Sequence, residues 1–297
     1  MFEKRKENEI IPLCYDRAFK KIFGNNDAIE RVEYFLSEYL DIPREALKGH
    51  VKVIESEKRI NTKNSKRQRV DVISDIELEE DDKRVNIELN IFENNTKRNI
   101  VYVCNLVSGS IKNKEAYSKM PKIIQINFNN YEVDESNPRI VQRYFLKNEE
   151  NHVLNEMIEI DQISLEKCYK AWYDKTVYKK EKKDQNIIKL GALLYMRDIK
   201  EIRSFIEKEL KMEKELKEEI IDAVEEYNED ADEQLFYDKE LDDWKVRQGA
   251  LDDAKSEGAK EEKISIAKNL LKENIPIDII SKTTGLSTKE LESIKNN

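Results

Sequence analysis

Three polar side chains within residues 70–92 have the types and the spacing of a metal-dependent hydrolytic site. Asp71 lies in the segment VDVISDIEL, and Glu88 and Asn90 lie in VNIELNIF, which follows a polar turn. The alternation of apolar residues predicts a hairpin of two strands. Paired residue numbers that sum to 161 set Asp71 against Asn90, and a sum of 159 sets Asp71 against Glu88. In both registers the three side chains share one face of the sheet.

Two carboxylates on neighbouring strands can share a divalent cation, which polarises a phosphate and lowers the pKa of its bound water. Carboxylates prefer hard cations, so Mg²⁺ is the expected ion, and Mn²⁺ or Ca²⁺ could replace it. Asn90, two residues after Glu88, could orient the attacking water. The alternative is a solvent-facing sheet surface on which the two acids pair with Arg69 or Arg84.

A cluster of six cations precedes the hairpin, with no acid between Lys58 and Asp71. Its members are Lys58, Arg59, Lys63, Lys66, Arg67 and Arg69. Such a cluster would attract a polyanion and hold a phosphate backbone without reading base sequence. A solvated loop is the alternative.

Composition excludes several other classes of protein. The chain has 297 residues, with 53 Lys and Arg against 62 Asp and Glu, for a net charge of −9. Residues 1–150 are electrically balanced, so the excess acid lies in residues 151–297. Three widely spaced Cys and two His argue against a disulfide framework and a His-rich zinc site. The sequence contains no apolar run long enough for a membrane span, and we expect a cytoplasmic protein.

The apolar patterning predicts an α/β block followed by a helical extension. Helices are expected at 16–23, 28–40 and 97–111, the last with Ile100, Cys104, Val107 and Ile111 buried. Strands are expected at 51–60, 70–78, 85–92, 123–128, 140–146 and 157–160. We therefore predict a mixed-sheet domain over residues 1–162. Residues 163–297 would form an all-helical extension that mediates self-association and makes a homo-oligomer.

The last residues predict a unit that resembles a helix-turn-helix. An amphipathic segment at 264–271 is followed by Pro276, by the sequence TGL at 284–286, and by a capping box of Ser287 and Glu290. The net charge of about +1 over residues 264–297 favours a packing or dimerising role over groove readout.

Residues 15–128 resemble the Rpn family of recombination-promoting nucleases, which are PD-(D/E)XK nuclease family transposases. The matching segments are DRAFKKIFG at 16–24, RVDV at 69–72, VNIELN at 85–90, Arg98, the helix through Tyr102, Tyr117 and IIQI at 123–126. The tail, with IAKNLL at 266–271 and TGLS at 284–287, is also similar to this family's C-terminal end.

The resemblance implies a restriction-endonuclease-like fold and Mg²⁺-dependent endonucleolytic cleavage of double-stranded DNA, linked to recombination, mobile elements or genome defence. Asp71 and Glu88 would be the metal ligands. The family usually has E-x-Q where this chain has Asn90, which leaves open a catalytically impaired nuclease-fold protein that acts in DNA association or assembly.

Two further residues could belong to the site. Asp16, on the first helix, could join the metal site or make an ion pair with Lys20 four residues on. Arg98 could meet a phosphate with its planar fork, or could make a structural salt bridge.

Overall fold

The computed structural model describes residues 8–54, 72–77, 82–91, 96–111, 116–134 and 136–296. Asp71 and the six cations between Lys58 and Arg69 therefore lie outside the described residues.

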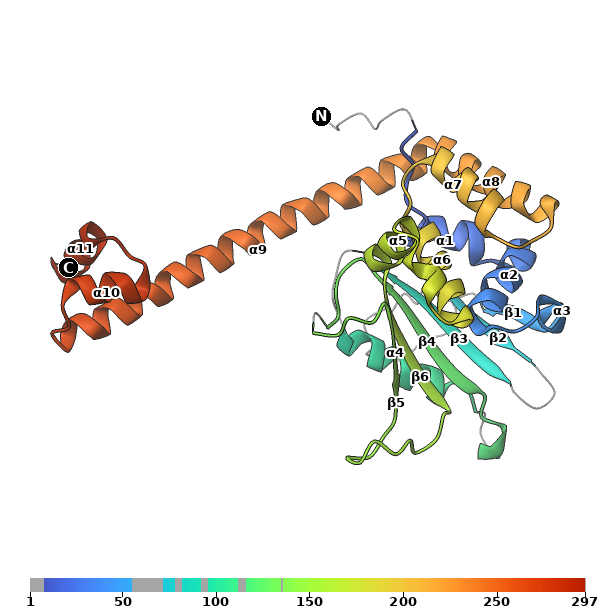
Figure 1. Ribbon diagram of the computed structural model, residues 1–297, viewed down its shortest axis with the longest axis horizontal. Coiled ribbons are helices and arrows are strands. Elements are labelled where there is room, and N and C mark those ends of the chain that lie inside the picture. Colours follow the sequence, from blue (N-terminus) through green and yellow to red (C-terminus); the bar gives the residue numbers. More distant parts are fainter. Residues whose placement is uncertain are drawn as a thin grey trace, which may run out of the picture. The chain divides into compact units, whose positions relative to one another are not determined.

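The described residues form a six-stranded mixed sheet in the order β1-β2-β3-β4-β6-β5 (Figure 1). The strands are β1 Val51–Ile54, β2 Val72–Ile76, β3 Lys83–Asn90, β4 Lys122–Asn129, β5 Val141–Phe145 and β6 Ile158–Ser164. The three central strands β3, β4 and β6 are parallel, and the outer pairs are antiparallel. The six predicted strands are confirmed, and so is the expected mixed-sheet fold.

Helices occupy both faces of the sheet and the C-terminal region. They are α1 Asp16–Phe23, α2 Ile29–Leu40, α3 Arg44–Leu47, α4 Thr96–Ser108, α5 Leu165–Tyr173, α6 Lys182–Tyr195, α7 Ile199–Glu209, α8 Lys214–Glu229, α9 Ala231–Lys272, α10 Ile277–Thr284 and α11 Thr288–Asn296, with short 3₁₀ helices η1 Asn26–Ala28, η3 Tyr117–Lys119 and η4 Thr176–Lys179. Among the described residues after Ser164 the structure has helices and no further strand, in agreement with the predicted helical region.

One side of the central strands is apolar and carries the main core. This apolar face consists of Val85, Ile87, Leu89, Ile124, Ile126 and Phe128, all buried. Helix α2 packs on it through Phe35 and Tyr39, whose rings lie 6.1 and 6.2 Å from the ring of Phe128. Helix α6 approaches α5 closely, because a Cβ atom on Gly191 would lie 2.6 Å from Sγ of Cys168. Glycine at this position permits the close packing of the two helices.

The opposite side of the same strands is polar although it is buried. This amide face carries Asn86 and Asn90 on β3, Gln125, Asn127 and Asn129 on β4, and Gln162 on β6, all less than 9 % exposed. The face follows from the register, because residues paired across neighbouring strands share a face and side chains alternate along each strand.

Helix α4 covers the amide face and turns a mixed stripe toward it. Its buried residues are Asn99, Tyr102, Val103 and Leu106, whereas Ile100 is 58 % exposed. The predicted apolar stripe that begins at Ile100 is therefore wrong. The prediction assumed an apolar surface beneath the helix, but the sheet presents amides there, and Asn99 is buried where the prediction placed an apolar residue.

One apolar core runs from Ile10 to Val224 and joins the sheet to α5, α6, α7 and α8. Contacts divide the chain into a unit of residues 1–234 and a unit of residues 235–297. The domain boundary that the sequence pattern predicts near residue 162 falls within β6, inside the first unit.

The second unit has a small core of its own. Ala267, Ile280, Leu286 and Leu291 are buried in it, from α9, α10, the turn and α11. The predicted capping box is present, since the backbone N–H of Ser287 donates to Oε2 of Glu290 at 2.8 Å. Over the described residues, no helix is long and apolar enough to cross a membrane.

Candidate active site

Strand β3 places Glu88 and Asn90 next to each other on the amide face, beneath α4. Glu88 is 1 % exposed and Asn90 is 3 % exposed. A carboxylate is almost never buried to this extent unless it is paired or holds a cation. The burial of Glu88 therefore argues against the solvent-facing sheet surface considered above for this residue.

Arg98, in the first turns of α4, reaches both of these residues. Its Nη2 donates a hydrogen bond to Oδ1 of Asn90 and lies 3.8 Å from Oε2 of Glu88. The guanidinium also lies over the ring of Tyr102, 5.7 Å from its centroid. The Arg98 side chain is 32 % exposed, so it lies partly in solvent while it also contacts the buried Glu88. The structure thus brings together three of the predicted site residues.

The amide of Asn90 is bonded at its other end as well. Its Nδ2 donates to Oδ1 of Asn129 at 3.0 Å, and Nδ2 of Asn129 donates to Oε1 of Gln162 at 2.8 Å. Sequence reasoning missed Asn129 and Gln162. The available signal was an amide at every second position of an otherwise apolar strand, in the segment IIQINFN.

A second amide chain crosses the same strands beside the first. Nδ2 of Asn86 donates to Oε1 of Gln125 at 2.8 Å, and Nε2 of Gln125 donates to Oδ1 of Asn127 at 3.1 Å. Nδ2 of Asn127 then donates to the main-chain oxygen of Asp161 at 2.9 Å. This chain stabilises the pairing of the central strands, and no hydrogen bond joins it to Arg98 among the described residues.

The register of the β2–β3 hairpin is one of the two that the sequence allowed. Val72 pairs with Ile87 and Ile76 pairs with Lys83, so the paired numbers sum to 159. If the same register continues to residue 71, Glu88 is its partner on the neighbouring strand. Asp71 itself lies outside the described residues.

Asp16 makes an ion pair with Lys20, which is one of the two roles predicted for it from the sequence. Its Oδ1 lies 2.9 Å from Nζ of Lys20, one helical turn on. Within the described ranges, no hydrogen bond or ion pair joins Asp16 to Glu88 or Asn90. Helix α1 packs through Phe19 on Phe35 of α2, and therefore belongs to the helices above the apolar face.

Asp75 is a second acid on the amide-face side of the hairpin, and Arg84 hydrogen-bonds to both of its carboxylate oxygens. Nε of Arg84 lies 2.5 Å from Oδ1 of Asp75, and Nη2 lies 2.7 Å from Oδ2. Arg84 also donates to the main-chain oxygen of Gly109 at the end of α4. The pair fastens the C-terminal end of α4 to the sheet and has the geometry of a structural salt bridge.

A separate buried acid lies on the apolar side of β6. Oη of Tyr39 donates to Oδ2 of Asp161 at 2.5 Å, and Asp161 is 1 % exposed. Burial, together with the nearby charge of Glu159, raises the pKa of Asp161 to about 7. Arg143 on β5 links this cluster to α6, because its Nη2 lies 2.8 Å from Oδ1 of Asp184. Sequence reasoning did not identify this cluster.

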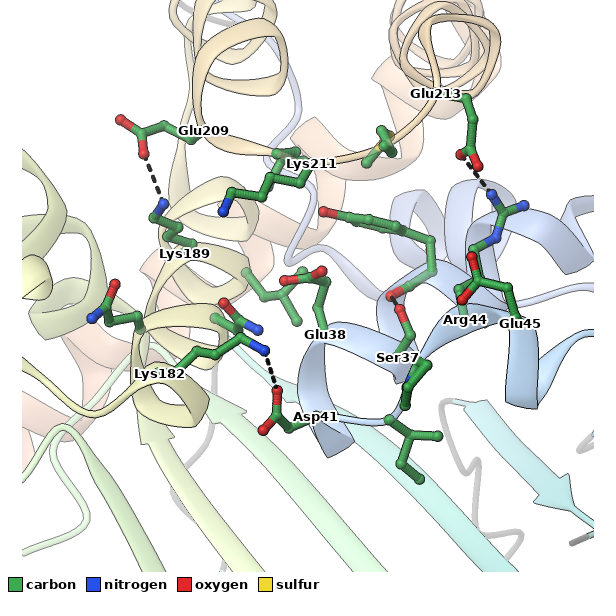
Figure 2. A pocket seen from close by; sticks show the side chains of 18 residues that line it. Ser37, Glu38, Asp41, Arg44, Glu45, Lys182, Lys189, Glu209, Lys211 and Glu213 are labelled. Carbon is green, nitrogen blue, oxygen red and sulfur yellow. Dashed lines mark hydrogen bonds and ion pairs between the residues drawn. The ribbon is translucent and has the colours of Figure 1, made fainter.

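A cavity of about 950 Å³ lies among α2, α3, α6 and the segment between α7 and α8 (Figure 2). Its charges are largely paired with one another: Lys189 with Glu209, Lys182 with Asp41, and Arg44 with Glu213. None of the predicted site residues lines it. Its mixture of both signs does not suit a polyanion.

Of the described acids on the amide face, Glu88 is fully buried, whereas the Asp75 side chain is 24 % exposed. No group of three His, Cys, Asp or Glu side chains that could hold a metal ion occurs in the part of the chain that the structure describes. A hard divalent cation needs several oxygen ligands. Glu88 thus fits a metal as one ligand, and a second carboxylate must come from elsewhere.

Comparison with known proteins gives one family. The family described as PD-(D/E)XK nuclease family transposase matches residues 13–254, which include the whole sheet and helices α1 to α8. Searches of curated proteins and of solved structures give no significant match.

Proposed function

The chain belongs to the PD-(D/E)XK nuclease family transposases, and from this premise we propose that it is a metal-dependent endonuclease that hydrolyses phosphodiester bonds in double-stranded DNA. The observation that carries the proposal is the buried carboxylate of Glu88, with Asn90 and Arg98 gathered around it beneath α4. A role in recombination, mobile elements or genome defence agrees with the family.

We assign metal binding to Asp71 and Glu88. The pairing sum of 159 in the described part of the hairpin supports this assignment, since it makes residue 88 the expected partner of residue 71. Mg²⁺, or Mn²⁺ or Ca²⁺ in its place, would supply charge neutralisation at the phosphate and a bound water of lowered pKa.

Asn90 and Arg98 would act on the water and on the phosphate respectively. An amide has two N–H bonds, and Asn129 takes one of those of Asn90, so a second donor remains to orient a water. The partly exposed guanidinium of Arg98 presents several donors in a planar fork that suits a phosphate. The cations Lys58, Arg59, Lys63, Lys66, Arg67 and Arg69 would hold the DNA backbone, and this part of the proposal rests on sequence alone.

Relaxation of supercoiled plasmid DNA in the presence of Mg²⁺ tests the proposal. We expect the wild type to nick the plasmid, and we expect Glu88→Gln and Asp71→Asn to nick at least about a hundredfold more slowly, since even the outer partners of metal ligands are worth about 10–100-fold. Absence of nicking by the wild type would refute the proposed nuclease activity, and so would nicking by both variants at the wild-type rate.

Asp75→Asn provides a matched control for a contaminating nuclease and for general damage to the hairpin. Asp75 lies on the neighbouring strand, and Arg84 engages its carboxylate. This variant should nick at the wild-type rate when it is purified in the same way. A loss as large as that of Glu88→Gln would mean that the assay reports folding instead of chemistry.

The second candidate function is a catalytically impaired nuclease-fold protein that associates with DNA. The observation in its favour is that Arg98 and Asn129 engage both ends of the Asn90 amide. Asn90→Gln restores the side chain usual in the family, and Asn90→Lys supplies the usual nuclease residue. A large gain of nicking in either variant would favour the impaired protein, and a loss would favour an active site adapted to asparagine.

Self-association through the helical region is the remaining proposal. Along α9, the side chains of Leu235, Phe236, Val246, Leu251 and Ile266 are exposed. Light scattering coupled to size exclusion measures the mass of the full chain, and a mass equal to 35.2 kDa at all concentrations would refute an oligomer.

A further inference from the structure

Asn99 is a buried amide on the side of α4 that faces the sheet, and it differs from the amides beneath it. Its side chain is 2 % exposed. Within the described part of the chain, neither Nδ2 nor Oδ1 of Asn99 has a hydrogen-bond partner. In contrast, Gln125, Asn127 and Asn129 on the amide face each use both ends of the amide in hydrogen bonds.

A buried amide without partners destabilises the folded state, because it has left water and has gained no hydrogen bond in return. Leucine is close to asparagine in size, is a better helix former and would avoid this loss. Val103 and Leu106 fill the same buried stripe of α4 with apolar side chains. An unpaired buried polar group in a folded protein indicates a bound polar species or a role in function. Asn99 therefore points to a polar group that pairs with it in the working protein.

The position of Asn99 on α4 sets it over the candidate site. Arg98, the preceding residue, donates to Oδ1 of Asn90 on β3. Arg84, near the other end of β3, donates to the main chain just after the end of α4, so the helix runs antiparallel to this strand. Consecutive residues of an α-helix point about 100° apart. Arg98 thus reaches the site from the partly exposed side of α4, and Asn99 approaches the same end of β3 from the side turned to the sheet.

The chemistry of a hard divalent cation explains why an amide would be kept there. Mg²⁺ in proteins is held by one or two carboxylates and keeps several of its water molecules. A water whose lone pair is bound to a cation can only donate hydrogen bonds, so it needs acceptors when the site is buried. The oxygen of an amide is a neutral acceptor, and its NH₂ group can donate to a neighbouring water.

From these observations we infer that Asn99 belongs to the candidate site, where its Oδ1 accepts a hydrogen bond from a water bound to the divalent cation. Because it acts through that water, Asn99 is a positioning residue. The inference rests on the proposed function, in which Glu88 is a metal ligand. It does not depend on which other groups contact Glu88 or Arg98, since the unpaired atoms that carry it are those of Asn99 itself.

The experiment measures thermal unfolding of the full chain without divalent cations, and Mn²⁺ binding by electron paramagnetic resonance of the free ion. Asn99→Leu should raise the melting temperature by about 2–4 °C, because it removes an unpaired buried amide and favours the helix. The same variant should bind Mn²⁺ about tenfold more weakly, the lower end of what outer partners of metal ligands contribute. An amide that only held α4 on the sheet would give the opposite result for stability, a lower melting temperature.

Asn99→Asp is the conservative variant. It keeps an acceptor oxygen at the same place, so it should bind Mn²⁺ at least as tightly as the wild type. Without the cation it should melt at a lower temperature, because it places a carboxyl group in a buried position. This variant also decides the question if Asn99→Leu does not fold.

Gln125→Met is the matched control. Gln125 is also a buried amide, but its two ends are bonded to Asn86 and Asn127. Its replacement removes two hydrogen bonds, so the variant should melt at a lower temperature than the wild type while its Mn²⁺ binding stays unchanged.

The outcomes separate this inference from the proposed function. Wild type that binds Mn²⁺, while Asn99→Leu binds it equally well or melts at a lower temperature, overturns the inference and leaves the nuclease proposal standing. Weaker Mn²⁺ binding by Asn99→Asp than by the wild type does the same. The expected pattern in a protein that never nicks DNA supports the inference and overturns the nuclease proposal. Wild type that binds no Mn²⁺ overturns both.

Discussion

Replacing Asp161 by asparagine should change how the stability of the protein depends on pH. Asp161 is 1 % exposed on β6, and Oη of Tyr39 donates to its Oδ2. Burial first, and the charge of Glu159 second, raise its pKa from the ordinary value of 3.8 to about 7, although Tyr39 and Arg143 oppose the shift. Lys183, on α6, also opposes it.

The direction in which stability changes with pH follows from how many protons the folded and the unfolded protein bind. Between pH 3.8 and about 7 the folded protein keeps a proton on Asp161 that the unfolded chain has released, so the free energy of unfolding falls as pH rises through this window. The gap of about 3 pKa units corresponds to at most about 4 kcal/mol, at 1.36 kcal/mol per unit. The stabilising effect is fully present below pH 3.8 and is lost as pH passes about 7.

Urea unfolding of wild type and Asp161→Asn, followed by circular dichroism from pH 4.5 to 8.5, measures this effect as a difference. Acids that do not interact with Asp161 cancel in the difference, and asparagine can still accept the bond from Tyr39. The variant should gain stability relative to wild type as pH rises. In the wild type the hydrogen bond from Tyr39 lowers the pKa of Asp161. Tyr39→Phe removes this bond and should therefore move the pH dependence of stability to higher pH. A difference that is constant over the whole range would refute the reasoning.

Three further perturbations test the packing. Gly191→Ala should lower the melting temperature despite the better helix propensity of alanine, because the new Cβ would lie 2.6 Å from Sγ of Cys168, and Cys168→Ala in the same chain should recover part of the loss. Phe35→Ala should cost about 3–5 kcal/mol in urea unfolding, because its ring packs edge-on against the rings of two other buried phenylalanines; a cost under about 1 kcal/mol would contradict the packing. Ser287→Ala removes one half of the capping box with Glu290 and should cost about 1 kcal/mol, measured as faster amide hydrogen exchange confined to residues 235–296.

The local elements follow from the sequence because their signals are local. Alternation of side chains identified the strands to within a few residues, and the spacing of Phe19, Ile22 and Phe23 predicted the bounds of α1. The capping box at Ser287 depends on two residues three apart, so the sequence alone determines it. The same alternation correctly set Glu88 and Asn90 on one face of β3.

Contacts between distant segments decided the rest. The buried stripe of α4 contains Asn99 instead of Ile100 because an amide face, assembled from three strands, lies beneath it. The compact unit extends to residue 234 because α5 to α8 bury their apolar sides in the core of the sheet.

The candidate site shows the same division. Sequence alone selected Glu88, Asn90 and Arg98, since each carries a side chain suited to the chemistry at a spacing that a strand or helix can use. Only the tertiary structure decided that Asn90 donates a hydrogen bond to Asn129 on β4. It also decided that Nη2 of Arg98 lies 3.8 Å from Oε2 of Glu88. Hydrogen bonds between strands depend on register and on which amide meets which, and no local pattern in the chain specifies that pairing.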